Sequence, residues 1–168
     1  AATGGLTWTD GQVMRFGNPS LTLGSGTTTG TFSSVFDIDN FATSDTQIAG
    51  LHYVKNNVTV GTANPVTLQA GDVLFAVDAN ETIGGVAVSK TDIVLFRPTT
   101  PGNYASGTFS VLLRDPGGTG KALQDFALVE ASITVGGTAL QAGDFLLAIS
   151  GATYDNDVWL FRPTTMAT

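Results

Sequence analysis

Short apolar runs alternate with polar, glycine-rich turns along the whole chain, and each run has the length of one β-strand. The clearest run ends in the hexapeptide LFRPTT, which occurs at residues 95–100 and again at 160–165. Four apolar residues followed by Arg-Pro predict a strand that is covered on both faces and then ends, because proline has no N–H for the next ladder bond. The hexapeptide therefore predicts the last strand of a repeated unit.

Three further motifs recur in the same order and indicate an internal repeat. They are GTFS at 30–33 and 107–110, VTVG at 58–61 with ITVG at 133–136, and QAGD at 69–72 and 141–144. These motifs predict units of about residues 30–106 and 107–165, with residues 1–29 as the tail of a partial unit in which Phe16 matches Phe96 and Phe161. The second unit is shorter, and we assign residues 80–88 to a stretch that it lacks.

The pattern predicts one all-β domain over residues 1–168. Threonine and valine favour strands, the 21 glycines favour turns, and no alternation of strands with helices is present. The strands are therefore expected to be antiparallel, with the two pseudo-symmetric repeats forming a sandwich or a barrel. The alternative is a set of propeller-like blades completed by oligomerisation, since two units are too few to close a ring.

Charge and composition restrict the partners of the protein. Its 7 Lys and Arg residues against 14 Asp and Glu give a net charge of -7, and the basic residues are scattered, which disfavours nucleic acid as a partner. No apolar run approaches the ~18 residues of a membrane span, so no membrane insertion is expected. The small-residue start, Ala1-Ala2-Thr3, fits a mature end after signal-peptide removal, and we expect an extracellular or cell-surface location.

Three of these segments together resemble a known kind of repeat. The segments are Val73–Val77, residues 92–99 and residues 107–110, each with a copy elsewhere in the chain. Their order resembles the tandem β-repeats of large secreted or surface proteins of bacteria. The resemblance covers most of residues 30–165 and implies an extracellular surface or matrix protein. It implies no activity.

No catalytic motif emerges from the sequence. A Ser-His-Asp triad would have to use His52, the only histidine, and no Gly-x-Ser-x-Gly sequence supplies a nucleophile. His52 lies in an apolar run and is expected to be a half-buried strand residue with a backbone partner. Most aspartates stand next to Gly, Asn or Pro, as turns require, which disfavours a glycosidase. We therefore predict a protein that is not an enzyme, with no catalytic residues.

Calcium is the strongest metal hypothesis, and no other cofactor is expected. Asp37 and Asp39 alternate along an extended segment, and Asp155 and Asp157 form a second group of carboxylates. Such hard oxygen ligands on loops suit Ca²⁺. Turn chemistry is the alternative explanation, since neither pair is kept in the other unit.

Other residues are candidates for binding and modification. Trp8, Tyr104 and Tyr154 lie in polar, glycine-rich surroundings and could stack on sugar rings. Asn57 and Asn80 begin the sequons Asn-Val-Thr and Asn-Glu-Thr, which would make the protein a glycoprotein if its host glycosylates them.

The sequence favours a non-enzymatic extracellular structural module that acts in self-assembly, as a fibre or surface layer, or in adhesion. The partial unit at the start predicts a terminal strand with an unpaired edge, and such edges add strands from other chains. We therefore expect self-association through terminal strands. The alternative is a carbohydrate-binding module with a polysaccharide as its partner, either with or without dependence on calcium.

Overall fold

The computed structural model describes residues 7–18, 24, 29–151 and 157–166. These residues form strands and one short 3-10 turn, η1 (Ile38–Asn40), and none of them lies in a helix long and apolar enough to cross a membrane. The strands are β1 (Gln12–Gly17), β2 (Thr31–Asp37), β3 (Ile48–Tyr53), β4 (Val58–Val60), β5 (Val66–Leu68), β6 (Val73–Val77), β7 (Glu81–Ile83), β8 (Val86–Val88), β9 (Ile93–Thr100), β10 (Asn103–Leu113), β11 (Leu123–Leu128), β12 (Ile133–Val135), β13 (Thr138–Leu140), β14 (Phe145–Ile149) and β15 (Trp159–Phe161).

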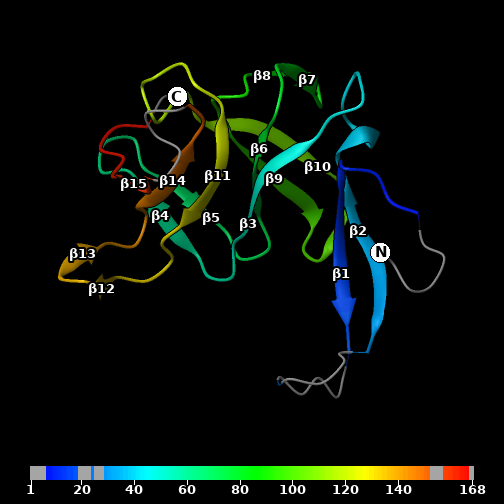
Figure 1. The fold of residues 1–168 in the computed structure, drawn as a ribbon, viewed down its shortest axis with the longest axis horizontal. Coiled ribbons are helices and arrows are strands. Elements are labelled where there is room, and N and C mark those ends of the chain that lie inside the picture. The colour runs from blue at the N-terminus through cyan, green and yellow to red at the C-terminus, as the bar shows by residue number, and fades with distance from the viewer. Residues whose placement is uncertain (1–6, 19–23, 25–28, 152–156, 167–168) are drawn as a thin grey trace.

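The larger strands form three layers that follow one another across the molecule (Figure 1). The tail hairpin is β1–β2, the first sheet has the order β10-β9-β6-β3, and the second sheet has the order β11-β14-β15. Every pairing between these strands is antiparallel, and none of the described sheets closes on itself. The protein is therefore an antiparallel, sandwich-like all-β fold, as the sequence predicts.

The strand registers show that the sheets repeat one another residue by residue. Val73 pairs with Phe96 in the first sheet, and Phe145 pairs with Phe161 in the second. Strand β6 is therefore the counterpart of β14, and β9 is the counterpart of β15. On the other side of each of these pairs, β3 and β11 take equivalent places, and each has a register shift two residues into the ladder.

The tail hairpin is the counterpart of β9–β10. Phe16 lies opposite Phe32 just as Phe96 lies opposite Phe109, so the match between Phe16 and Phe96 that the sequence suggests holds in the register as well. The GTFS copy at 107–110 lies in β10 and pairs with β9. In the sheets, one structural repeat therefore begins at β3 and the next begins at β11.

A small hairpin followed by an aspartate turn occurs three times. The hairpins are β4–β5, β7–β8 and β12–β13, and the turns that follow them end at Asp72, Asp92 and Asp144. The second of these hairpins covers most of residues 80–88. The sequence predicts that this stretch has no counterpart in the second unit. In structural terms it is a third copy of a shared element, with Gly84-Gly85 in the place of Gly136-Gly137.

Both faces of the first sheet are covered, because its central strands are apolar throughout. All five residues of β6 are buried. Val73, Phe75 and Val77 face a core shared with the tail hairpin and η1, while Leu74 and Ala76 face a core shared with the second sheet. The run of four apolar residues before Arg97 behaves in the same way. The prediction of strands covered on both faces is confirmed for this sheet. The prediction that the first copy of the hexapeptide ends its strand at Arg-Pro is wrong, because β9 continues to Thr100 and Pro98 lies opposite Gly107 of β10.

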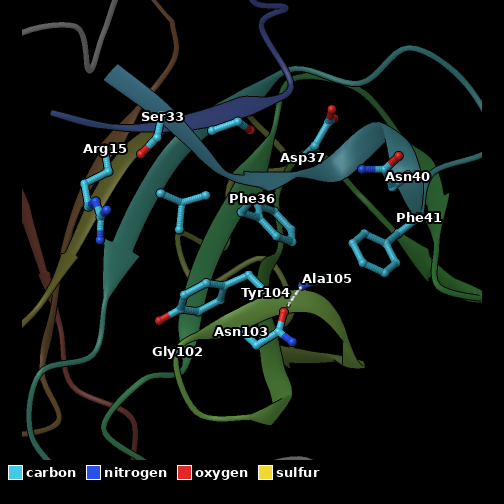
Figure 2. A pocket seen from close by; sticks show the side chains of 12 residues that line it. Arg15, Ser33, Phe36, Asp37, Asn40, Phe41, Gly102, Asn103, Tyr104 and Ala105 are labelled. Carbon is cyan, nitrogen blue, oxygen red and sulfur yellow. Dashed lines mark hydrogen bonds between the residues drawn. The ribbon is translucent and has the colours of Figure 1, made fainter. Parts of the chain in front are cut away.

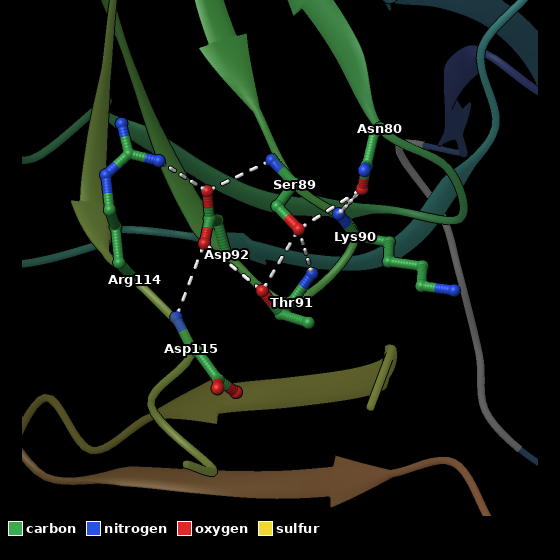
Figure 3. A network of polar contacts seen from close by, with 7 residues as sticks. All are labelled: Asn80, Ser89, Lys90, Thr91, Asp92, Arg114 and Asp115. Carbon is green, nitrogen blue, oxygen red and sulfur yellow. Dashed lines mark hydrogen bonds and ion pairs between the residues drawn. The ribbon is translucent and has the colours of Figure 1, made fainter. Parts of the chain in front are cut away.

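Each aspartate turn is fastened by a buried carboxylate. Asp72 accepts a hydrogen bond from the Gln69 N–H at 2.7 Å, and Asp144 accepts the equivalent bond from the Gln141 N–H at 2.7 Å. Asp92 accepts from the Ser89 N–H and also from the Asp115 N–H (Figure 3). All three aspartates are 1–2% exposed, so these carboxylates replace lost water with fixed N–H donors.

Arg97, within β9, and Arg162, directly after β15, neutralise two of these buried carboxylates. Arg97 donates from Nε and Nη2 to the two oxygens of Asp72, at 3.0 and 2.6 Å, and its Nη2 also donates to the Thr67 carbonyl. Arg162 makes the matching fork with Asp144 at 2.7 Å on both arms. The LFRPTT arginines thus join one strand, β9 or β15, to the turn that starts its neighbour, which explains why the hexapeptide and the QAGD motif recur together.

Removing the charge of Asp72 should destabilise the fold. In Asp72→Asn the forked pair with Arg97 is lost, and because that guanidinium is about a third exposed we expect a loss of only about 1–2 kcal/mol in the free energy of unfolding. Urea denaturation at pH 7 measures it. The matched control is Asp78→Asn, an exposed aspartate, which should change the value by less than about 0.5 kcal/mol. Equal effects of the two substitutions would contradict a structural role for the fork.

Candidate functional site

Exposed apolar side chains gather at the outer surfaces of the layers. Single exposed apolar residues are ordinary, but contiguous ones mark interaction surfaces. The large apolar side chains that are exposed among the described residues are Trp8, Phe32, Leu51, Tyr53, Ile133, Val135, Val158 and Leu160. The internal repeat provides a comparison for several of these residues, because the equivalent position in another layer shows whether that side chain is buried there.

The outer surface of the second sheet is open where that of the first sheet is covered. Val158 and Leu160 are 70% and 42% exposed, whereas their counterparts in β9, Ile93 and Leu95, are 0% and 6% exposed. We call this surface the terminal face, and it comprises Ile133, Val135, Leu146, Val158 and Leu160.

The hairpin next to β14 shows the same contrast. Ile133 and Val135 of β12 are 58% and 57% exposed, whereas Val58 and Val60 of β4, at the equivalent places, are 3% and 0% exposed. The β4 residues are buried in the core that the first sheet shares with the second. The terminal face is therefore the same apolar surface without a covering layer from the residues that the structure describes.

A second open surface lies on the first sheet, on the side of the tail hairpin. Leu51 and Tyr53 of β3 are 38% and 51% exposed. Their counterparts in β11, Phe126 and Leu128, are 4% and 5% exposed because the first sheet covers them. The tail hairpin contains counterparts of β9 and β10 only, so it covers one half of the first sheet and leaves the other half open.

The open half is hollowed into a cleft beside β1. Its cavity of about 510 Å³ is mainly apolar, and we call it the acceptor cleft. Val13 and Arg15 of β1 form one wall, Leu51 and Tyr53 lie on the first sheet, and Tyr104 of β10 closes one side. Figure 2 shows Tyr104 and Arg15 from the adjoining part, where the ring lies beneath the tail hairpin.

The adjoining part of the cleft is polar. It holds a further 410 Å³ and is lined by Ser33, Asp37, Asn40 and Asn103 together with Phe36, Phe41 and Tyr104 (Figure 2). Burial, followed by a hydrogen bond and charge interaction with Tyr53, raises the pKa of Tyr104 to about 12. The Tyr104 hydroxyl is protonated at neutral pH with or without this shift, and it already shares a hydrogen bond with Tyr53.

The three predicted aromatic ligand residues do not form one site in the described structure. Arg15 and Phe16 are adjacent in β1 and so point to opposite faces of the tail hairpin. Tyr104 lies on the Arg15 side, whereas Trp8 packs on Phe32 at 5.8 Å between ring centroids, and Phe32 in turn packs on Phe16 at 5.1 Å. Tyr154 lies outside the described residues.

Two of the four predicted calcium ligands, Asp37 and Asp39, take part in turn formation. Asp37 caps η1 by accepting from the Asp39 N–H and also accepts from Gln12 Nε2, while Asp39 accepts from the Thr46 N–H at 3.0 Å. Asp157 is exposed, and Asp155 lies outside the described residues. Within the part of the chain that the structure describes, no group of three acidic, His or Cys side chains is placed to hold a metal ion.

The two sequon asparagines occupy equivalent places in the repeated hairpin. The Oδ1 atom of Asn57 accepts from the Ala70 N–H, and that of Asn80 accepts from the Lys90 N–H (Figure 3). Ser132 takes the same role by accepting from the Ala142 N–H. This shared turn contact accounts for both asparagines without a glycan, and both remain exposed and open to modification.

His52 and Glu130 join the first sheet to the second. The His52 Nε2 atom lies 3.1 Å from Glu130 Oε1, and its Nδ1 atom accepts from the Leu128 N–H at 3.4 Å. Glu130 also accepts from the backbone N–H groups of Lys55 and Asn56. His52 is thus half-buried with a backbone partner, as its apolar run indicates, but its contact with Glu130 is not visible in the sequence.

Comparisons with known proteins add no identity to this chain. No protein-family model, no curated protein sequence and no solved structure matches it. The candidate site must therefore be judged from its own geometry.

Glu130 should make the stability of the fold depend on pH. Burial raises the pKa of Glu130, but the hydrogen bonds from Lys55, His52 and Asn56 outweigh burial and lower the pKa below its ordinary 4.5. A lowered folded-state pKa means that the carboxylate stabilises the fold above pH 4.5 and that this contribution is lost as the pH falls through the lowered value. Glu130→Gln should therefore cost about 1 kcal/mol at pH 7, and progressively less toward pH 3.

Urea denaturation of the wild type and of Glu130→Gln across that pH range measures the difference. A difference that stays constant from pH 7 to pH 3 would show that the ionised carboxylate is not what joins the two sheets.

Proposed function

We propose that this protein is a non-enzymatic extracellular structural module that assembles head to tail into a fibre or a layer. The observation that carries the proposal is the contrast between Val158 and Leu160, which are exposed, and Ile93 and Leu95, which are buried at the same repeat positions. Within the chain, the face that bears Ile93 and Leu95 is covered by another sheet. The terminal face has the same character and is available for the same kind of contact.

The energetics favour a covered terminal face. Burying an exposed Val or Leu side chain contributes about 1.5–3 kcal/mol, and the second sheet exposes Val158 and Leu160 while its hairpin β12–β13 exposes Ile133 and Val135. Association costs at least ~4 kcal/mol of translational and rotational freedom, so a few residues would not suffice alone. Burial of all five apolar residues of the terminal face together would offset this cost.

The two open surfaces differ, which determines the kind of assembly. The terminal face is on the second sheet, and the acceptor cleft is between the first sheet and the tail hairpin. A contact between two different surfaces is heterologous, and it continues from copy to copy unless the rotation closes a ring. Fibres and layers are built from contacts of this type. The net charge of -7 is compatible with such assembly because only 12% of the residues are charged.

The extracellular setting is part of the same proposal. The Thr- and Gly-rich composition and the resemblance to secreted bacterial repeats support a cell-surface or matrix location. Adhesion is compatible with the same architecture, since a stack of sheets can also carry a surface partner.

A carbohydrate-binding module is the second candidate, and the polar part of the cleft supports it. Tyr104 and Phe41 offer ring faces, and Asn40 and Asn103 offer amide groups, which together are the side chains that sugar sites use. A polysaccharide array tests this candidate. Binding that is lost in Tyr104→Ala and kept in Trp8→Ala would support it, whereas an array without any binding would exclude it for the glycans presented.

Weakening the terminal face should abolish assembly without unfolding the protein. Val158→Ser/Leu160→Ser removes apolar surface that is already exposed, so the free energy of unfolding of the monomer should change little. We expect the wild type to form elongated assemblies in negative-stain electron microscopy at high concentration and the double variant to remain monomeric in light scattering.

The control is Ala79→Ser, an exposed position between β6 and β7 that belongs to neither surface. It should assemble like the wild type. A wild type that stays monomeric at millimolar concentration, or a double variant that assembles as well as the wild type, would contradict the proposed function.

A further inference from the structure

Arg15 differs from the other arginines of the chain in having no carboxylate partner among the residues that the structure describes. Arg97, Arg114 and Arg162 each form an ion pair with a buried aspartate. Arg15 is exposed, and it lines both the mainly apolar part and the polar part of the acceptor cleft (Figure 2). Its guanidinium therefore has donors available for a ligand with a negative charge.

The internal repeat shows that the shared fold does not require an arginine at this position. Phe16 is the counterpart of Phe96, so Arg15 stands where β9 has Leu95 and β15 has Leu160. A leucine serves the strand equally well in the other two layers. The positive charge is thus a feature of β1 alone, and it lies where β1 faces the cleft.

Two tyrosines lie at the same end of the cleft as Arg15. The Tyr104 ring packs on the buried Phe96 ring with 6.5 Å between centroids, and its hydroxyl shares a hydrogen bond with Tyr53. These two contacts hold the Tyr104 ring in place without a ligand. Two hydroxyls that share one hydrogen bond keep one proton to donate elsewhere, so the pair can also donate to a ligand oxygen.

The polar part of the cleft offers groups that bind hydroxyls. The Oδ1 atom of Asn103 accepts from the Ala105 N–H, which leaves the Asn103 amide nitrogen to donate to a ligand (Figure 2). Asp37 lines the polar part but not the mainly apolar part. A negative charge on a ligand is therefore disfavoured near Asp37 and favoured near Arg15. The Tyr104 ring, which lines both parts, lies between these two ends.

We propose that the acceptor cleft binds a sugar ring that carries a carboxylate, such as a uronic acid unit of a polysaccharide. The Arg15 guanidinium binds the carboxylate through two parallel hydrogen bonds, the Tyr104 ring packs on the sugar ring, and Asn103 binds a sugar hydroxyl. The cavity of about 510 Å³ is within the ~300–1,000 Å³ of ligand sites.

This inference rests on the carbohydrate-binding candidate of the proposed function and narrows it to acidic sugars. It does not rest on the proposed assembly, because the terminal face contributes no residue to the cleft.

Calorimetric titration with short oligomers of galacturonic, mannuronic and guluronic acid tests the proposal, each beside its neutral, carboxyl-reduced form. We expect the wild type to bind at least one acidic oligomer about tenfold or more tightly than the neutral form, because the neutral form cannot make the charged fork with Arg15. Equal affinity for both forms would overturn the acidic preference and keep the carbohydrate-binding candidate. Binding of none of these oligomers would overturn the inference.

Arg15→Leu separates a ligand contact from a structural role. It gives β1 the side chain that β9 and β15 have at this position, so the free energy of unfolding should change little. We expect a loss of about tenfold or more in affinity for the acidic oligomer and no loss for the neutral one. Unchanged affinity for the acidic oligomer would overturn the inference.

The matched control is Lys121→Gln, which removes one positive charge at an exposed position outside the cleft. It should bind the acidic oligomer like the wild type. A loss equal to that of Arg15→Leu would show attraction by overall charge and would contradict a site at Arg15.

Sedimentation of the same samples measures assembly separately. A protein that binds the acidic oligomer and stays monomeric at every concentration would support this inference and contradict the proposed assembly. A protein that assembles and binds none of the acidic oligomers would overturn this inference alone.

Discussion

The structure depends on one constraint: a sheet whose central strands are apolar on both faces needs a layer on each side. Strand β6 shows this most clearly, with Phe75 turned toward the tail hairpin and Leu74 toward the second sheet, both fully buried. The forked Arg97–Asp72 pair and its copy hold β9 and β15 to the turns that start the neighbouring strands β6 and β14. The stack within the chain therefore consists of repeats of one unit, and each of its outermost layers exposes apolar side chains.

In this stack of repeated layers, the exposure of a residue can be compared with that of its counterpart in another layer, which is not possible in a single sandwich. An isolated exposed leucine is unremarkable on any protein surface. Leu160 is informative because Leu95, at the same repeat position, is buried by a neighbouring layer. The same comparison applies to Tyr53 and Leu128 at the other open surface. The internal repeat thus shows how buried each position is when a neighbouring layer covers it.

Much of the fold could be predicted from the sequence, because the repeated motifs consist of residues that favour strands and turns. The all-β class, the buried run before Arg97 and the match of Phe16 to Phe96 follow from local patterns. The third hairpin was missed because Val86-Ala87-Val88-Ser89 shares size and alternation with its counterparts rather than letters. The contact of His52 with Glu130 was missed because the two residues lie 78 positions apart and only the stacking of sheets brings them together. Turn chemistry was the alternative to calcium at Asp37 and Asp39, and backbone N–H groups do donate to both carboxylates.

The central claim is that the open apolar surfaces are covered by further copies in an open-ended series. Sedimentation velocity over a wide concentration range tests it most directly. The account predicts a weight-average mass that keeps rising beyond that of a dimer as concentration increases, since each added copy presents a new terminal face. A mass that stays at 17.3 kDa, or that levels off at a dimer, would contradict it.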